Sequence, residues 1–138
     1  MKVLSLTYSK WFGIRESAVP EHMLFMPLNP KFLNHLGTIH ASATYSLAET
    51  ASGYFLQKNF KDIADQTIPL LRASTIRYRR AGVGDLFASV KLKGGNLKEI
   101  RDILILKRKV SITMEVKVTD EHNQVILTGI FEWFVTLK

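Results

Sequence analysis

The alternation of apolar and polar residues is clearest in the last third of the chain. Between residues 110 and 119, Val, Ile and Met alternate with polar residues, which is the two-residue period of a β-strand with one buried face. Alternation of this kind, interrupted by turns that contain Gly, Asn and Asp, predicts further strands in the rest of the chain. The strands predicted in this way are 68–80, 85–93, 110–119 and 125–137, and they follow a hairpin made of 14–19 and 22–28.

A helical period runs from residue 41 to residue 58, where no proline occurs. Apolar residues recur every fourth position, at Ala43, Leu47, Ala51 and Phe55. Ala, Ser and Gly dominate the first half, and such small side chains let other backbone approach from several sides. We therefore expect a helix embedded in the fold. Residues 97–104 are ambiguous, although Asn96 followed by Glu99 has the pattern of a helix cap.

These elements indicate an α+β fold. A hairpin, one long helix and four consecutive antiparallel strands leave the apolar face of the sheet with one long helix to cover it. The helix must then lie across the middle with a curved antiparallel β-sheet wrapped around it, which is the hotdog fold. The chain has 138 residues and no repeat or linker, so we expect one domain over residues 1–138.

Composition narrows the chemistry. Because the chain has no cysteine, disulfides, cysteine-based metal sites and a cysteine nucleophile are excluded, and a cytoplasmic location is expected. The run Val3-Leu4 is too short for a signal peptide, and no stretch is long enough to span a bilayer. His22, His35 and His122 show no metal-ligand spacing, so no metal is expected.

The formal net charge of +7 favours anionic partners: nucleic acid, anionic lipid or a phosphate-bearing small molecule. No helix-turn-helix, RNP-like or zinc pattern supports nucleic acid. The best candidates for phosphate contacts are Arg72, Arg77, Arg79 and Arg80. Alternation places Arg77 and Arg79 on one face of their strand, and Arg72 and Arg80 on the other. A solvated edge strand blunted by charge is the alternative interpretation.

The segment before the long helix carries the most specific pattern. It reads Asn34-x-x-Gly37-Thr38-x-His40-Ala41-Ser42 and continues as Leu47-Ala48-Glu49-x-Ala51. This pattern resembles the signature of hotdog-fold acyl-CoA thioesterases of the phenylacetyl-CoA (PaaI-like) type, in which Asn…Gly-x-x-His-Gly-Gly leads into the central helix with its acidic residue. The resemblance covers roughly residues 13–137. The variant His-Ala-Ser resembles a less studied branch, related to a domain fused to some acetyltransferases.

The resemblance implies hydrolysis of an acyl thioester, with no cofactor other than the coenzyme A of the substrate. It implies that Glu49 is the base or nucleophile, and that the Ala41 backbone N–H and the Asn34 amide polarise the carbonyl. His40 either orients Asn34 or contacts the thioester, or it is a structural residue of the turn. The Cβ of Ala41 stands where glycine would let substrate approach closely. Substrate-binding residues are expected at Gly37, Thr38, Ser42, Arg77, Arg79 and Arg80.

Helix geometry adds a constraint to this assignment. At about 1.5 Å per residue, Ala41 and Glu49 lie roughly 12 Å apart along one helix. One thioester carbon must lie about 3 Å from both the attacking group and the oxyanion donors. One helix cannot supply both groups to a single site, so either the chemistry is different or the carboxylate comes from a second copy of the helix. A two-fold homodimer with antiparallel helices, or a tetramer of such dimers, meets this requirement, and the resembling family is built that way.

Two other functions stay open at this point. A hydratase or dehydratase of the same fold would pair a histidine with a carboxylate at other spacings, and those motifs are not found. A non-catalytic acyl-CoA-binding protein would keep the pocket without turnover, and Ala41 in place of glycine favours this alternative. The sequence names neither the acyl group nor its carrier, which is coenzyme A or acyl carrier protein.

Overall fold

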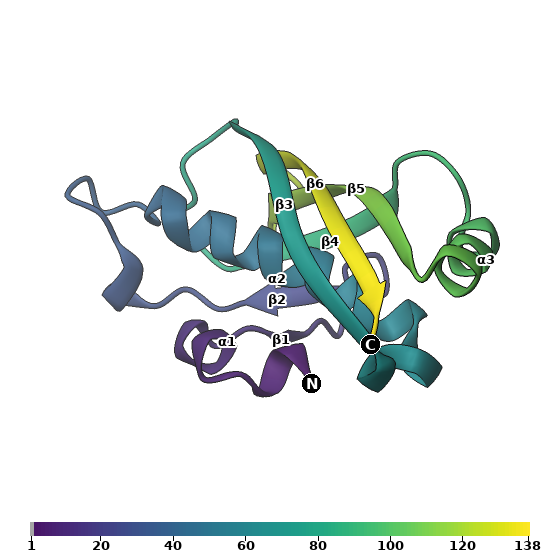
Figure 1. Ribbon diagram of the computed structural model, residues 1–138. Helices are drawn as coiled ribbons and strands as arrows, with labels where there is room; N and C mark the ends of the chain where they lie inside the picture. The colour runs from purple at the N-terminus through teal and green to yellow at the C-terminus, as the bar shows by residue number, and fades with distance from the viewer. Residues whose placement is uncertain (1) are drawn as a thin grey trace.

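The computed structural model describes residues 2–138 and confirms the predicted α+β architecture (Figure 1). One long helix, α2, lies against a single antiparallel sheet. The elements along the chain are η1 (Val3–Ser5), α1 (Thr7–Phe12), β1 (Arg15–Glu16), β2 (Leu24–Met26), η2 (Pro30–Phe32), α2 (Ala41–Asn59), η3 (Lys61–Gln66), β3 (Thr67–Tyr78), β4 (Leu86–Leu92), α3 (Leu97–Lys107), β5 (Lys109–Asp120) and β6 (Val125–Leu137).

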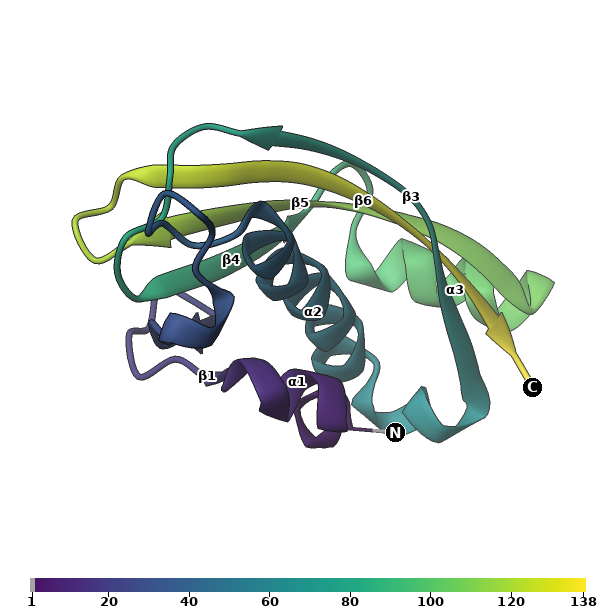
Figure 2. The same ribbon diagram turned by 90° about the vertical axis from the view of Figure 1, so that its left-hand side faces the viewer.

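The six strands are arranged in the order β1-β2-β4-β5-β6-β3. Strand β3 pairs with β6 and forms one edge of the sheet, so it is separated from β4, the next strand in sequence, by β6 and β5. Residues 79–85 therefore carry the chain across the end of the sheet. Figure 2 shows the result: the long strands curve over α2, as expected for the hotdog fold.

Helix α2 is buried over most of its length, as its small residues predicted. Leu47, Ala48 and Ala51 have no exposed surface, and they contact the core that the strands supply. In β5 the buried residues alternate from Val110 to Val118, which confirms the two-residue period seen in the sequence. The sheet and the helix thus form one hydrophobic core.

The ambiguous segment 97–104 after β4 belongs to the helix α3, which extends to Lys107. The Asn96 side chain accepts a hydrogen bond from the Glu99 N–H at 2.9 Å, so the predicted cap is present. Ile100 and Leu104 are buried against the core on the α2 side of the sheet. Among the described residues, no helix lies on the opposite, outer face of the sheet (Figure 2).

The prediction that Arg72 and Arg77 lie on opposite faces of β3 is wrong. The pairing of β3 with β6 shifts between Leu71 and Ala73, so Arg72 forms a bulge. One extra residue reverses the alternation that follows it. The Arg72 guanidinium consequently lies 3.8 Å above the ring of Phe134 on the outer face, which is the face of Arg77. Alternation alone assumed an unbroken strand.

No helix within residues 2–138 combines the length and the apolar character needed to cross a membrane.

Replacing Leu47 with alanine tests the placement of the core. Leu47→Ala should lower the free energy of unfolding by about 2–5 kcal/mol, because the side chain is fully buried between α2 and the sheet. Urea denaturation at a fixed protein concentration measures the change. The control is Leu106→Ala, whose side chain is 80% exposed on α3 and whose loss should cost no more than about 0.5 kcal/mol. Similar losses for the two variants would contradict this core.

Candidate functional site

A tight turn precedes α2 and is held by the side chain of Asn34. Its Oδ1 accepts the N–H groups of Leu36 and Thr38 at 2.9 and 3.1 Å, and its Nδ2 donates to the Thr38 hydroxyl at 2.8 Å. Gly37 has a φ of 75°, a left-handed conformation that glycine adopts without strain. Asn34, Gly37 and Thr38 therefore lie together, as the motif predicted, and one N–H of the Asn34 amide is used within the turn.

The residues immediately before α2 are fixed from two sides. The Ile39 N–H donates to the Gly82 carbonyl at 2.8 Å, and the His40 N–H donates to the Phe32 carbonyl at 2.8 Å. The His40 Nδ1 accepts the Ser42 N–H at 3.1 Å and lies 2.7 Å from the Ser42 hydroxyl. His40 is thus the N-cap residue of the helix, and the first turn of α2 has a defined position.

The backbone N–H of Ala41 is available at the start of the helix. His40 occupies the next three donors, because its side chain accepts from Ser42 and its carbonyl accepts from Ala43 and Thr44. The Ala41 N–H forms no hydrogen bond within residues 2–138, and Ala41 is exposed. An unpaired donor at the positive end of a helix dipole favours a negatively charged oxygen.

Glu49 lies about two turns further along α2 and is half-buried. Its carboxylate forms neither a hydrogen bond nor an ion pair within the described part of the chain, and the Ser52 hydroxyl donates to its backbone carbonyl. Burial raises the pKa of the Glu49 carboxyl above its ordinary value of 4.5. A carboxylate that is partly desolvated without compensation is costly for folding, which marks it as a functional candidate.

Contacts one turn before Glu49 define the two walls of its surroundings. The Tyr8 hydroxyl of α1 lies 2.8 Å from the Ser46 hydroxyl, and the Tyr45 hydroxyl lies 3.0 Å from that of Ser74 in β3. Positions 45 and 46 flank position 49 on the helix surface. Glu49 therefore faces the space between α1 and β3.

Contacts one turn after Glu49 bring the sheet onto the helix. A Cβ at Gly53 would lie 3.5 Å from the ring of Trp133, so the indole packs closely against the α2 backbone. The indole N–H donates to the Ser52 hydroxyl at 2.9 Å, and that hydroxyl donates to the Glu49 carbonyl at 2.7 Å. Trp133 thus fixes the sheet beside the carboxylate-bearing turn.

The side of α2 that carries Glu49 and the free edge of β3 face the same direction. Figure 2 shows α2 between α1 and β3, the two elements that contact the helix on either side of position 49. The edge strand has twelve residues, and Ile68 and Leu70 are 44% and 56% exposed. A long, partly apolar strand edge of this kind is an interaction surface unless something covers it.

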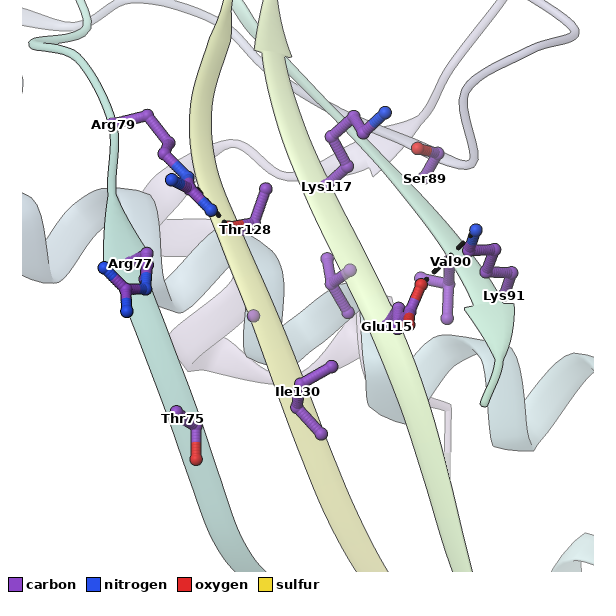
Figure 3. A pocket seen from close by; sticks show the side chains of 12 residues that line it. Thr75, Arg77, Arg79, Ser89, Val90, Lys91, Glu115, Lys117, Thr128 and Ile130 are labelled. Atoms are coloured by element: carbon purple, nitrogen blue, oxygen red, sulfur yellow. Dashed lines mark hydrogen bonds and ion pairs between the residues drawn. The ribbon is translucent and has the colours of Figure 1, made fainter. Parts of the chain in front are cut away.

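The predicted arginines lie elsewhere. Arg77 and Arg79 line a hollow of about 630 Å³ on the outer face of the sheet (Figure 3), and Arg80 follows, its backbone N–H bonded to the Ile126 carbonyl at 3.3 Å. The sheet therefore separates Arg77 and Arg79 from Glu49 of the same chain. The residues predicted for one site therefore lie in three separate places within one chain: the start of α2, Glu49, and the outer hollow.

Sequence reasoning did not find Tyr8 and Trp133 beside Glu49. They lie 41 residues before it and 84 after it, so no local spacing could connect them to it. Within the described residues, no group of three or more His, Asp or Glu side chains is placed to hold a metal ion.

The raised pKa of Glu49 predicts a pH-dependent stability difference. A carboxyl whose pKa is higher in the folded state destabilises the fold once it is ionised, so its cost appears as the pH rises above the unfolded value. Glu49→Gln should therefore be more stable than wild type at about pH 7, and the difference should shrink towards about pH 4. Urea denaturation at both pH values measures it, with exposed Glu21→Gln as the control. A pH-independent difference would contradict this account of Glu49.

Comparison with solved structures places this geometry among known folds. The protein PA5026 of Pseudomonas aeruginosa, described as a "Probable Thioesterase", superposes with a TM-score of 0.82 at 22% identity over 99% of this chain and 91% of that chain. Thioesterase HI1161 of Haemophilus influenzae gives 0.74 at 15% identity over 98% and 86%. The protein BH2602 of Bacillus halodurans, whose structure contains CoA, gives 0.65 at 20% identity over 81% and 69%.

A search of the curated proteins finds no match to the sequence. The family described as "Domain of unknown function (DUF4442)" matches residues 14–135. The chain therefore belongs to the DUF4442 family, and its fold is the hotdog fold that it shares with proteins named as thioesterases.

Proposed function

We propose that the protein is an acyl-CoA thioesterase whose active site is made by two copies of the chain. The observation that carries the proposal is the pair of unpartnered groups on α2: the Ala41 N–H at the start of the helix and the half-buried Glu49 carboxylate. Thioester hydrolysis needs these two kinds of group, a donor for the developing oxyanion and a carboxylate for water. The shared fold and the CoA bound to BH2602 support the choice of substrate.

The free edge of β3 provides the way to bring the two groups together. Two copies related by a two-fold axis pair their β3 edges into one continuous sheet, which gives the backbone groups of these edges hydrogen-bond partners. The exposed sides of the two α2 helices then meet in antiparallel orientation, because they face the same direction as the edges. Ala41 of one chain approaches Glu49 of the other, which removes the separation of about 12 Å within one helix.

In this site the thioester carbonyl accepts a hydrogen bond from the Ala41 N–H, and the helix dipole favours the negative charge that develops on the oxygen. The second N–H of the Asn34 amide is a further donor. Glu49 of the partner subunit takes a proton from water as the water oxygen bonds to the carbonyl carbon. The tetrahedral intermediate then expels the thiolate, which receives the proton from Glu49, and the products are a carboxylic acid and the thiol of CoA.

Direct attack by Glu49 is the second route that the same geometry allows. It forms a mixed anhydride and releases the thiolate, and water then hydrolyses the anhydride to regenerate the carboxylate. Both routes need an ionised Glu49 and an oxyanion donor. The raised pKa of the carboxyl suits either role, since it makes the carboxylate a stronger base.

Replacing Glu49 with glutamine tests the role of the carboxylate. Glu49→Gln keeps the size of the side chain but can neither accept a proton from water nor attack, so kcat should fall about a hundredfold or more with KM little changed. Release of free thiol from a panel of acyl-CoAs measures this, with Glu21→Gln as the control. Wild-type turnover by Glu49→Gln would contradict the mechanism. Binding of acyl-CoAs by the wild type without turnover would instead support an acyl-CoA-binding function.

Replacing Ala41 with proline tests the donor and the two-chain site together. Ala41 is the first residue of α2, where proline is well tolerated, and the backbone of His40, with φ −58° and ψ 137°, lies in the polyproline II region that a residue before proline adopts. The change removes the N–H that has no intramolecular partner, so the fold should persist while kcat falls about tenfold or more.

Mixing the two variants then distinguishes a site shared between two chains from a site within one chain. In a heterodimer of Glu49→Gln and Ala41→Pro, one site has both defects and the other has neither. Random exchange of subunits should therefore restore about a quarter of the wild-type rate. Light scattering confirms that the samples are dimeric. If the mixture is no more active than the separate variants, the site is not shared between chains.

A further inference from the structure

The side chains that line the outer hollow are arranged in rows across the strands, as the strand register shows. One residue from each of four adjacent strands forms a row across it: Ser89 pairs with Lys117, Lys117 with Thr128, and Thr128 with Arg77. Every side chain in this row can donate a hydrogen bond, and none is acidic. Figure 3 shows the row on the sheet surface, with Arg79 directly after the end of β3 and its guanidinium beside Thr128.

A second row lies two residues further along the strands and is electrically balanced. It runs from Lys91 through Glu115 and Ile130 to Thr75. Lys91 and Glu115 form an ion pair at 3.3 Å, so the one carboxylate that lines the hollow is already neutralised. The unbalanced positive charge of the hollow therefore belongs to the first row and Arg79.

The cations of the first row have no ionic partner of their own. Within residues 2–138, Arg77, Arg79 and Lys117 form no ion pair, and Arg79 Nε donates to the Thr128 hydroxyl at 3.2 Å. The row spans three strand spacings, about 14 Å in all. Guanidinium groups are matched to phosphate oxygens, and a row of this width suits several phosphates better than one.

The hollow is connected to the start of α2 around the end of the sheet. The hydrogen bond from Ile39 to the Gly82 carbonyl joins two short segments, with Ala41 two residues after Ile39 and Arg79 three residues before Gly82. At about 3.5 Å per residue, the backbones of Ala41 and Arg79 lie within roughly 20 Å of each other along this path. A ligand that reaches both places must be elongated, with a phosphate-rich end and a reactive end.

We infer that the row Ser89, Lys117, Thr128 and Arg77, together with Arg79, binds the phosphates of the nucleotide end of coenzyme A. The thioester end of the same molecule lies at Ala41 of the same chain, and the connecting arm passes Gly82. This inference rests on the proposed function for the identity of the ligand. The charge of the row and its separation from Glu49 by the sheet are properties of the fold alone.

Two double variants with matched chemistry test the row. Arg77→Gln with Lys117→Gln removes one arginine of β3 and one lysine of β5 from the row. The control, Arg72→Gln with Lys109→Gln, removes the same residue types from the same strands, outside the hollow. Both are made in a Glu49→Gln background, and CoA binding is measured by calorimetry at two salt concentrations. Absence of hydrolysis in the wild type therefore leaves this experiment intact.

We expect the row variant to bind CoA about tenfold or more weakly than its parent, with a flatter dependence on salt, and the control to bind within about twofold. For dephospho-CoA, the difference in affinity between the row variant and its parent should be smaller than for CoA. Pantetheine, which lacks the nucleotide, should bind to all of the proteins with the same affinity. Equal effects of the two double variants would show a diffuse field rather than a site and would overturn the inference.

A second arm distinguishes the nucleotide from an acidic carrier protein. In the Glu49-containing protein, kcat/KM is compared for an acyl-CoA and for the same acyl group on acyl carrier protein. If the row variant has a lower kcat/KM for the acyl-CoA but not for the carrier-protein substrate, the row binds the nucleotide of CoA. A loss confined to the carrier-protein substrate, with unchanged CoA affinity, would assign the row to a protein surface and overturn the inference.

Discussion

The close approach of the curved sheet to α2 is the contact on which the rest of the structure depends. It is possible because small residues stand where the elements meet: Ala48, Ala51 and Ser52 have no exposed surface. The sheet is equally tight within itself, since a Cβ at Gly129 would lie 2.7 Å from Ile76 and 2.9 Å from Phe131. One helix can fill such a core only if its surface is nearly free of large polar groups.

Helix α2 nevertheless carries buried hydroxyls, and these are satisfied. Ser46 bonds to the Ser42 carbonyl, and Ser52 links the Trp133 indole to the backbone carbonyl of Glu49. Glu49 is different, because its half-buried carboxylate has no partner within residues 2–138. Folding explains the hydroxyls, whereas the cost of Glu49 has no structural compensation in a single chain. The exception on an otherwise consistent helix is where function is expected.

The sequence was sufficient for the long helix α2 and the long strands, but it did not predict α1 and it did not specify how the elements contact each other. The bounds of α2 follow from helical spacing and small residues, and the cap at Asn96 follows from local hydrogen-bond chemistry. The bulge at Arg72 was missed because alternation gives no sign of where a strand gains a residue. The position of β3 beside β6 was missed for a related reason, since an apolar pattern does not specify which strand pairs with which.

The site shows the same division. The motif brought together Asn34, Thr38 and His40, because they are neighbours in sequence and form one turn. The walls beside Glu49 and the lysine of the outer row come from distant elements. Lys117 meets Arg77 only through the register of three strands, which no spacing along the chain encodes.

In the proposed dimer, the start of α2 in one chain and Glu49 of the other chain affect each other's chemistry. Closing the interface removes more water from Glu49, and desolvation raises the pKa of a carboxyl further. The partner's helix start approaches the same carboxylate with its unpaired Ala41 N–H and its positive dipole, which favours the ionised form. In the proposed dimer the carboxyl is thus subject to two opposing effects, since desolvation raises its pKa and the partner's helix start lowers it. A thioester oxygen that then takes the Ala41 N–H withdraws that stabilisation from Glu49, so substrate binding itself makes the carboxylate a better base.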